Sequence, residues 1–395
     1  MPHFQSHTVE TTKPARLTLQ ASVRRSTVLV VGGAGYIGSI LSADLLEAGY
    51  NVLVLDSLLY GGESLAPLLG KPGFDLHVGD TRDERIVRQL LGEVSAVVHL
   101  GEIVGDPACN LDPDVTVSVN FAATTRLARL ASELGVERFI YPSSCSVYGA
   151  TNEIVDEMDS PNPVSLYAEA KIASEQAVLR LRSDRFHPTI FRLATVYGHS
   201  PRPRFDLVVN TLAGRAVADR RIVVNGGEQW RPFVHVSDVA SMLLETLRMP
   251  LESVSGETFN LGSNDQNYTI RGVAEIVREH VPWTEVEFAP VVDHRNYRVS
   301  FDKVADMLGF RALRTVSDGV HEIARALQSG KIMDSRDPRH SNVRALIETD
   351  ARRILWREDL FDGEPAAPFR PRDLDADRFG RSPIARSLSP EGAIR

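Results

Sequence analysis

The sequence predicts an α/β protein in which a doubly wound parallel sheet is joined to a smaller C-terminal lobe. Three observations lead to this prediction. A strand pattern, a glycine-rich turn, a helix pattern and a second strand pattern follow one another from Thr27. Strand and helix patterns then alternate to about residue 200, and beyond it the alternation loosens.

The first unit begins with Thr27–Val31, a continuous apolar and β-branched run that is typical of a strand buried on both faces of a parallel sheet. Seven residues, Gly32–Gly38, then form the turn. Apolar residues from Ile40 to Leu46 share one face of the helix that follows. The second strand is Asn51–Asp56, which completes a βαβ unit with an expected right-handed crossover.

The alternation continues along the next 130 residues or so and indicates a Rossmann sheet. The further strands are expected at 75–79, 96–100, 138–141 and 188–193, and the helices at 84–91, 117–134 and 166–182.

We expect four segments. Residues 1–25 form a flexible leader, and residues 26–200 form the Rossmann domain. Residues 201–330 form mainly a substrate-binding lobe, with elements interleaved with the Rossmann domain. Residues 331–395 form a C-terminal extension that is partly disordered, although 343–356 has a helical pattern.

Composition limits the partners and the compartment. The 44 Lys and Arg residues against 52 Asp and Glu residues leave a net charge of −8, which argues against nucleic acid or an anionic membrane as the partner. Two cysteines, Cys109 and Cys145, are too few for a disulfide framework. Because neither a signal peptide nor a membrane-spanning stretch is evident, we expect a cytoplasmic protein, and we expect no metal site.

The glycine turn predicts a dinucleotide site. Gly32 permits the tight turn, Gly35 lets the backbone approach a pyrophosphate, and Gly38 allows the helix to pack closely on the sheet. The helix N-terminus then faces the phosphate charge. Asp56 ends the second strand, where a carboxylate accepts hydrogen bonds from the adenosine ribose. Because Ser57–Leu59 offers no cation for a 2′-phosphate, NAD is expected rather than NADP.

A phenol and an ammonium, Tyr167 and Lys171, are four residues apart and lie on one helix face. A nearby lysine favours the phenolate, so we expect it to lower the pKa of Tyr167 from its usual value near 10. The pair could then exchange a proton with a sugar hydroxyl while a hydride moves to or from nicotinamide. Ser144, at the end of the preceding strand, could donate a hydrogen bond to the same oxygen.

Together these motifs resemble the extended short-chain dehydrogenases/reductases, in the branch that holds UDP-galactose 4-epimerase and the nucleotide-sugar dehydratases. The resemblance spans about residues 27–310. It is carried by Gly32–Gly38, Gly79–Asp83, His99-Leu100, Asn120, Ser143–Gly149, Tyr167–Lys171 and Trp230–Asp238.

The resemblance implies a role for each matching residue. Tyr36 and Ile37 belong to the cofactor turn, Asp80 would bind the adenine amino group, and Leu100 and Asn120 would line the NAD site. Tyr167 would be the catalytic acid/base, with Ser144 as its hydroxyl partner and Lys171 on the nicotinamide ribose.

The resemblance also places the substrate. Arg231 would grip a diphosphate, and a second arginine is expected shortly before Phe301, where Arg295 is preferred to Arg298. Thr195 stands where the family has an Asn that contacts the sugar. Arg202 and Arg204 either add positive charge to the substrate mouth or are solvated loop residues.

Two positions depart from the family pattern. The 4,6-dehydratases carry an Asp-Glu pair where this chain has Cys145 and Ser146, so 4,6-dehydration is not expected. Cys145 is either a buried filler or an acid/base thiol above the sugar. Glu102 stands where a small residue is usual, and it is either an unusual base with a raised pKa or a solvated side chain.

The resulting hypothesis is an NAD-dependent epimerase that acts on a nucleotide-diphosphate sugar through a transient keto intermediate. The resemblance implies a homodimer formed through helices at about 118–134 and 166–182. The alternatives are a dehydratase, a ketoreductase or a decarboxylase on the same scaffold, or a non-catalytic protein that binds nucleotide sugars.

Overall fold

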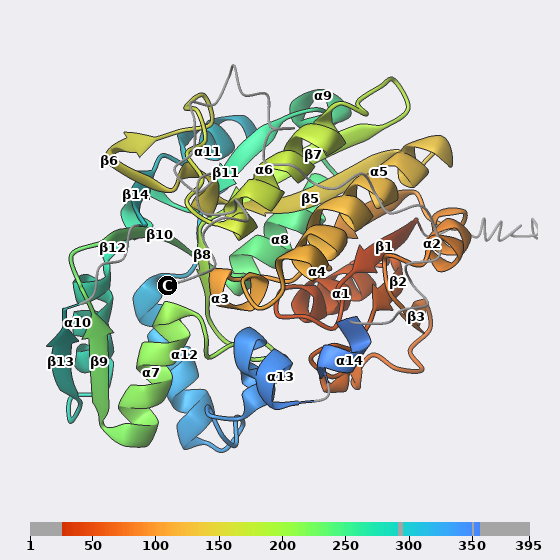
Figure 1. The fold of residues 1–395 in the computed structure, drawn as a ribbon. Helices are drawn as coiled ribbons and strands as arrows, with labels where there is room; N and C mark the ends of the chain where they lie inside the picture. The colour runs from red at the N-terminus through yellow and green to blue at the C-terminus, as the bar shows by residue number, and fades with distance from the viewer. Residues whose placement is uncertain (1–25, 291–294, 350, 356–395) are drawn as a thin grey trace, which may run out of the picture.

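A seven-stranded parallel sheet forms the centre of the computed structural model, which describes residues 26–290, 295–349 and 351–355 (Figure 1). The strand order is β11-β7-β5-β4-β1-β2-β3, and every neighbouring pair is parallel. The predicted fold class is therefore confirmed. The strands are β1 (Thr27–Val31), β2 (Asn51–Asp56), β3 (Phe74–Val78), β4 (Ala96–His99), β5 (Arg138–Ser144), β7 (His187–Leu193) and β11 (Thr258–Leu261).

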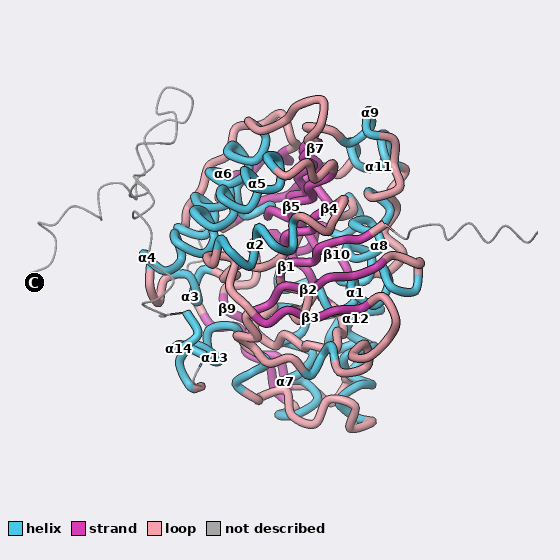
Figure 2. Tube along the Cα trace, turned by 90° about the vertical axis from the view of Figure 1, so that its right-hand side faces the viewer, coloured by secondary structure: helices cyan, strands magenta, loops and turns pink. Residues whose placement is uncertain are grey.

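The strand order reverses direction between β1 and β4, and in such sheets a ligand binds beyond the carboxyl ends of the strands at this point. Helices cover both faces of the sheet (Figure 2). One face carries α2 (Glu84–Leu91), α5 (Thr124–Glu133) and α6 (Leu166–Leu179), and the other carries α1 (Gly38–Glu47) and α8 (Val236–Thr246).

Strand β1 shows why its sequence is continuously apolar. Val28 and Val30 belong to the core beneath α1 and α8, whereas Leu29 and Val31 belong to the core beneath α2, α5 and α6. Successive side chains of a strand point to opposite faces, so a strand covered on both faces needs apolar residues at every position.

The smaller lobe has its own hydrophobic core, in which Phe233 and Ile222 are fully buried. Its helices are α7 (Val208–Asp219), α10 (Ile270–His280) and α12 (Val316–Gln328). Its strands form the sheet β8 (Thr195–Tyr197), β10 (Trp230–His235) and β12 (Asn267–Thr269), and the pairs β9 (Arg221–Asn225) with β13 (Glu285–Ala289) and β6 (Ala150–Val155) with β14 (Asn296–Val299).

Several elements cross the expected boundary near residue 200. Helix α8 and strand β11 return to the main sheet from the second half of the chain, and β6 leaves the first half to pair with β14. The division into domains at that residue remains a prediction. The short helices are α3 (Asp106–Cys109), α4 (Pro113–Thr116), α9 (Leu251–Val254) and α11 (Asp302–Leu308).

Two helical predictions differ in detail. The helix expected at 117–134 is a π-helical segment, Val117–Ala123, that continues into α5. The pattern at 343–356 forms two helices, α13 (Asn342–Glu348) and α14 (Ala351–Leu355), so this part of the C-terminal extension is ordered. The expected leader, 1–25, and the tail, 356–395, lie outside the described residues. Among the helices described, none has the length and apolarity required to cross a membrane.

Candidate active site

The turn between β1 and α1 has no room for a side chain at Gly32 or at Gly38. Gly32 has a φ of +79°, and a Cβ added there would lie 2.7 Å from the Gly101 nitrogen. A Cβ at Gly38 would lie 2.2 Å from the Gly32 carbonyl oxygen. The Gly35 N–H donates to that same oxygen at 3.1 Å, which closes the turn. The arrangement fits a pyrophosphate held against backbone at the start of α1.

This crowding predicts the effect of Gly38→Ala. The added methyl group must displace the Gly32 carbonyl, so we expect NAD binding to weaken by tenfold or more, or about 1.4 kcal/mol per factor of ten. The measurement is the NAD content and the dissociation constant of the purified variant. Gly92→Ala is the matched control, because its nearest neighbour, the Gln89 oxygen, lies 3.5 Å from the added Cβ. Unchanged NAD binding in Gly38→Ala would contradict this assignment of the turn.

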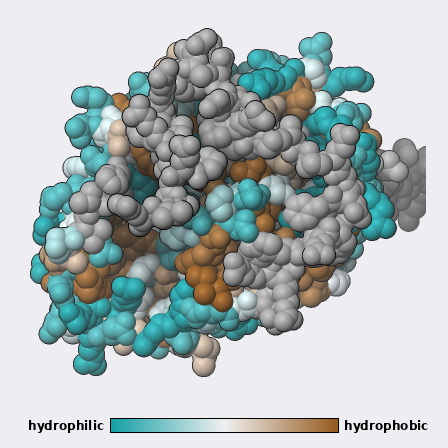
Figure 3. All heavy atoms as spheres, in the orientation of Figure 1, coloured by the Kyte–Doolittle hydropathy of each residue, from teal (hydrophilic) through white to brown (hydrophobic). Residues whose placement is uncertain are grey.

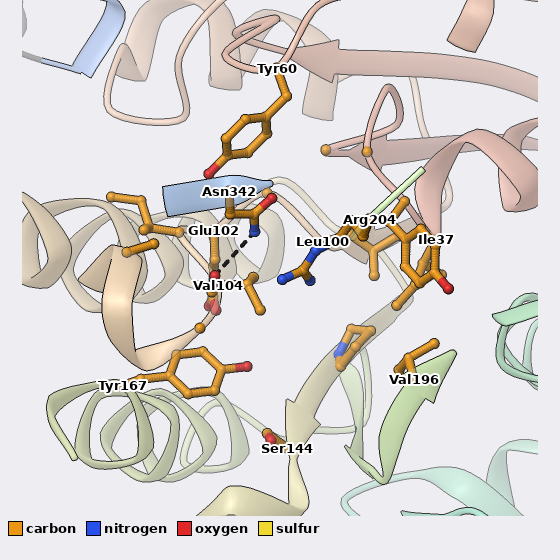
Figure 4. A pocket seen from close by; sticks show the side chains of 18 of the residues that line it. Ile37, Tyr60, Leu100, Glu102, Val104, Ser144, Tyr167, Val196, Arg204 and Asn342 are labelled. Atoms are coloured by element: carbon orange, nitrogen blue, oxygen red, sulfur yellow. Dashed lines mark hydrogen bonds between the residues drawn. The ribbon is translucent and has the colours of Figure 1, made fainter. Parts of the chain in front are cut away.

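A cavity of about 490 Å³ opens beside the turn, between the carboxyl ends of the strands and the smaller lobe. Ile37 and Leu100 line one side of it, with Ser144 and Tyr167 opposite (Figure 4). Tyr36 also lines it, while its hydroxyl donates to the Gly198 carbonyl at 2.7 Å and so ties the turn to the smaller lobe. In the space-filling view, hydrophobic residues gather toward the middle of this face of the molecule (Figure 3).

Two carboxylates line the cofactor end of the cavity. The Asp56 oxygens accept the N–H groups of Ala34 and Leu58 at 2.9 and 2.8 Å, which fixes the carboxylate and leaves lone pairs for ribose hydroxyls. Burial raises the pKa of Asp56, and these two backbone donors oppose that effect. Asp80 is held by Arg82, whose Nη2 lies 2.7 Å from its carboxylate.

The structure brings Ser144, Tyr167 and Lys171 together, from the end of β5 and the first turns of α6. Both α6 side chains are buried at the cavity wall. The expectation for the phenol is wrong, however. Burial, followed by the charge of Glu102, raises the pKa of Tyr167 well above its usual value, although hydrogen bonding with Ser144 lowers it.

The charge of Lys171, which was expected to lower the pKa of Tyr167, is paired with a carboxylate. Its Nζ lies 2.6 Å from the Glu102 carboxylate and donates to the Pro142 carbonyl at 2.7 Å. Glu102 is therefore not solvated, since its side chain is 2% exposed. The small residue usual at this position could not have formed this ion pair, which sequence reasoning did not anticipate.

Cys145 is not placed as an acid/base group, which corrects that alternative. Its side chain is 1% exposed in the main core and its Sγ donates to the Arg192 carbonyl at 3.2 Å, outside the cavity lining. Burial raises the pKa of Cys145 well above its usual value, so the thiolate is disfavoured. Ser146 is the neighbour that lines the cavity.

Asn120 also differs from its expected role. It sits in the π-helical segment, and its side chain accepts from the Ile103 N–H at 2.9 Å and donates to the Ile103 carbonyl at 2.7 Å. Among the described residues it is not part of the cavity lining. It therefore clamps the loop that follows β4, rather than lining the cofactor site itself.

The smaller lobe contributes the expected substrate residues Arg231, Arg295 and Thr195 to the cavity wall. Arg231 is buried and stacks over the Tyr297 ring with its guanidinium 5.3 Å from the ring centre. Arg295 pairs with Asp106 at 3.1 Å. Arg298 lies outside this cavity, where it donates to the Asn152 carbonyl, so the geometry favours Arg295 of the two.

Arg202 and Arg204 are buried rather than solvated, and both line the cavity. Arg204 binds Asp206 through two hydrogen bonds of 2.9 and 3.0 Å. The Arg202 guanidinium lies 4.4 Å from the centre of the Tyr60 ring. Arg202 therefore adds positive charge to the cavity wall, whereas the charge of Arg204 is paired with Asp206, which lines the same cavity.

A segment that sequence reasoning did not assign to the site also covers it. We call residues 337–349 and 351–355 the C-terminal strap. Asn342, Val343 and Leu355 line the cavity, and Leu346 packs in a cluster with Tyr167 and Ile103. Figure 1 shows α13 beside α3, and Figure 4 shows Asn342 across the cavity from Tyr167.

Hydrogen bonds fasten the strap to the cavity wall. The Asn342 backbone N–H donates to Asp206 at 2.9 Å and its side chain donates to the Val104 carbonyl at 3.1 Å. Arg82 donates to the Leu355 carbonyl at 2.9 Å, so the group that holds Asp80 also holds the end of the strap. Among the described residues, no group of three or more His, Cys, Asp or Glu side chains could hold a metal ion.

Comparisons with known proteins point to one family. The model of the "NAD dependent epimerase/dehydratase family" matches residues 28–262. The chain is 28% identical over 328 residues to UDP-glucuronic acid decarboxylase 1 of Arabidopsis thaliana, covering 78% of this chain and 71% of that one. It is 25% identical over 310 residues to a putative UDP-glucose 4-epimerase of Methanocaldococcus jannaschii, covering 76% and 98%.

A solved structure, MoeE5 in complex with UDP-glucuronic acid and NAD, superposes with a TM-score of 0.68 at 28% identity. The match covers 77% of this chain and 100% of the other, so this chain carries additional sequence.

Proposed function

We propose a function from the premise that this chain belongs to the NAD dependent epimerase/dehydratase family. Its cofactor is NAD, which the glycine turn and Asp56 fit and which solved relatives hold. Within that family, we propose that the chain is an epimerase that acts on a nucleotide-diphosphate sugar through a transient keto sugar.

The residues at the cavity support this chemistry. NAD supplies a hydride acceptor and, after reduction, a hydride donor. Tyr167 takes the proton of the sugar hydroxyl as the hydride leaves the same carbon, and returns that proton when the hydride is delivered to the other face. Ser144 lines the cavity together with the phenol, and we propose that Arg231 and Arg295, which also line it, hold the diphosphate.

One observation favours epimerisation over dehydration: the carboxylates at the substrate side of the cavity are paired. Glu102 is bound to Lys171 and Asp106 to Arg295. The two positions after Ser144 supply a buried thiol and a hydroxyl. Dehydration needs a base for one carbon and an acid for the departing hydroxyl, and among the described lining residues an adjacent carboxylate pair does not occur.

Mass spectrometry tests the proposal in two stages. Denaturing the purified protein is expected to release NAD, because a cofactor regenerated in each cycle need not leave. Native protein is then incubated with UDP-, dTDP- and GDP-linked sugars and uronic acids. An epimerase gives a product of unchanged mass and different chromatographic mobility, with no net NADH absorbance. Loss of water, loss of carbon dioxide or stoichiometric NADH would instead identify a dehydratase, a decarboxylase or a ketoreductase.

We also propose, from the family, a cytoplasmic homodimer that associates through the outer faces of α5 and α6. Sedimentation of the purified chain tests the dimer, and charged substitutions on those faces should yield monomers.

A further inference from the structure

A buried network of polar groups lies behind Tyr167. The Glu102 carboxylate stands 2.6 Å from the Lys171 ammonium, and these side chains are 2% and 6% exposed. The other Glu102 oxygen accepts the Tyr141 hydroxyl at 2.7 Å and the Thr124 hydroxyl at 3.2 Å. Three elements, β5, α5 and α6, therefore converge on one carboxylate.

The directions of the hydrogen bonds in this network indicate which of its side chains are charged. Because the Thr124 hydroxyl gives its hydrogen to Glu102, it must accept one from His99, whose Nε2 lies 2.8 Å away. Burial lowers the pKa of His99 to about 4, so this imidazole is neutral at physiological pH. The ionic partner of Glu102 is thus Lys171.

Lys171 is turned toward this network more than toward Tyr167. Its Nζ lies 4.5 Å from the centre of the Tyr141 ring and 5.9 Å from that of Tyr167. A carboxylate at 2.6 Å offsets most of the ammonium field beyond the pair, since opposite charges so close act on a third group as a dipole.

We propose that Glu102 is a positioning residue that holds Lys171 in a buried ion pair, so that the phenolate of Tyr167, the form that takes the substrate proton, is stabilised less than it would be beside an unpaired ammonium. The proposal rests on the proposed function in one respect, that Tyr167 is the group that exchanges the substrate proton. Removing the negative charge at 102 leaves the Lys171 charge uncompensated, which favours the phenolate.

The other charged groups around Tyr167 act in the same direction as Glu102, whereas the Ser144 hydroxyl opposes them. From α3, Asp106 and Cys109 raise the pKa of Tyr167, and Asp106 is itself paired with Arg295. From β5, the pKa of Tyr141 is raised well above its usual value by burial and by Glu102, so it stays protonated. The Glu102–Lys171 ion pair is therefore the part of this environment where one substitution removes the charge that faces Lys171.

The test is a titration of Tyr167 in the full-length, NAD-loaded protein. The chain is labelled with fluorotyrosine, whose phenol is more acidic than that of tyrosine, and is observed by fluorine NMR. The resonance of Tyr167 is the one that disappears when Tyr167→Phe is added to the wild type or to a variant. In Glu102→Gln, which keeps the size of the side chain and its ability to accept hydrogen bonds, the Tyr167 midpoint is expected to fall by about 1 to 2 pH units. The pH profile of turnover should move by the same amount.

Two further variants test the direction in which the titration midpoint of Tyr167 moves. Lys171→Met leaves Glu102 uncompensated and should raise the midpoint, whereas Glu102→Gln/Lys171→Met removes the pair as a unit and should return it close to wild type. Glu169→Gln is the matched control, because it removes another buried carboxylate from the same helix and should leave the midpoint unchanged. Should Glu102→Gln fail to fold, Glu102→Ala is used, since a small residue is usual here in the family.

The outcomes separate this inference from the proposed function. An unchanged midpoint in the folded Glu102 variant, or an equal shift in Glu169→Gln, overturns the inference whatever the enzyme does. A lowered midpoint in a protein that turns over no nucleotide sugar supports the inference and rejects the proposed function.

Discussion

Tyr167→Phe is expected to lower turnover of the nucleotide sugar by about 10³- to 10⁴-fold, at the upper end of what positioned acid–base groups contribute. The hydroxyl removed is the one that lies at the cavity beside Ser144, and no other phenol in the described lining shares that position. The ring remains, so its packing against Ile103 and Leu346 should persist. NAD content should consequently stay at the wild-type level.

The measurement is the rate of product formation by chromatography, together with NAD released on denaturation. Tyr50→Phe, outside the cavity, serves as the control for loss of a phenol and should keep full turnover. The turnover of Ser144→Ala is expected to lie between those of the two tyrosine variants, because it loses a hydroxyl that lowers the pKa of Tyr167 but keeps the proton carrier. Wild-type turnover in Tyr167→Phe would reject the catalytic assignment.

Local sequence patterns predicted those features of the fold and of the site that depend on residues close together in the sequence. The strands β1 and β2 were expected at the residues where they occur, because a strand buried on both faces must be apolar throughout. The glycine turn was also predictable from the local sequence. A side chain at Gly32 or Gly38 would collide with residues of the same βαβ unit or with the end of the adjacent strand β4. The four-residue spacing likewise placed Tyr167 and Lys171 on one helix.

Contacts between distant segments were not predictable in this way. Glu102 and Lys171 are far apart in sequence, and nothing in either segment indicates that the two side chains form an ion pair. The pKa of Tyr167 is raised rather than lowered, first by burial and then by the charge of Glu102, and neither effect can be seen in the local sequence. Asn120 was misplaced because its motif gives no sign that both side-chain groups bind Ile103. The strap was missed because its weak periodicity hides a few buried residues that pack on the cavity.

The strap leads to the second large expected effect. A chain ending at Met333 lacks α13 and α14, together with the Asn342, Val343 and Leu355 parts of the cavity wall. We expect NAD to dissociate on the order of 10- to 100-fold faster, a change of about 1.4 to 2.7 kcal/mol in the stability of the complex. Arg82 would lose its bond to the Leu355 carbonyl and hold Asp80 less firmly.

Two point variants distinguish a loss of NAD retention from a general loss of stability in the shortened chain. Leu346 is 1% exposed in the cluster with Tyr167, so Leu346→Ala should loosen the strap while leaving the chain complete. Ile347, its neighbour on α13, is 60% exposed, and Ile347→Ala should retain NAD as the wild type does. The protein is loaded with NADH, and the release of NADH after dilution is followed by its fluorescence. If the shortened chain and Leu346→Ala both release NAD at the wild-type rate, the strap covers the cavity without retaining its cofactor. If they release it faster while Ile347→Ala does not, retention depends on the buried face of α13, and the C-terminal strap belongs to the cofactor site.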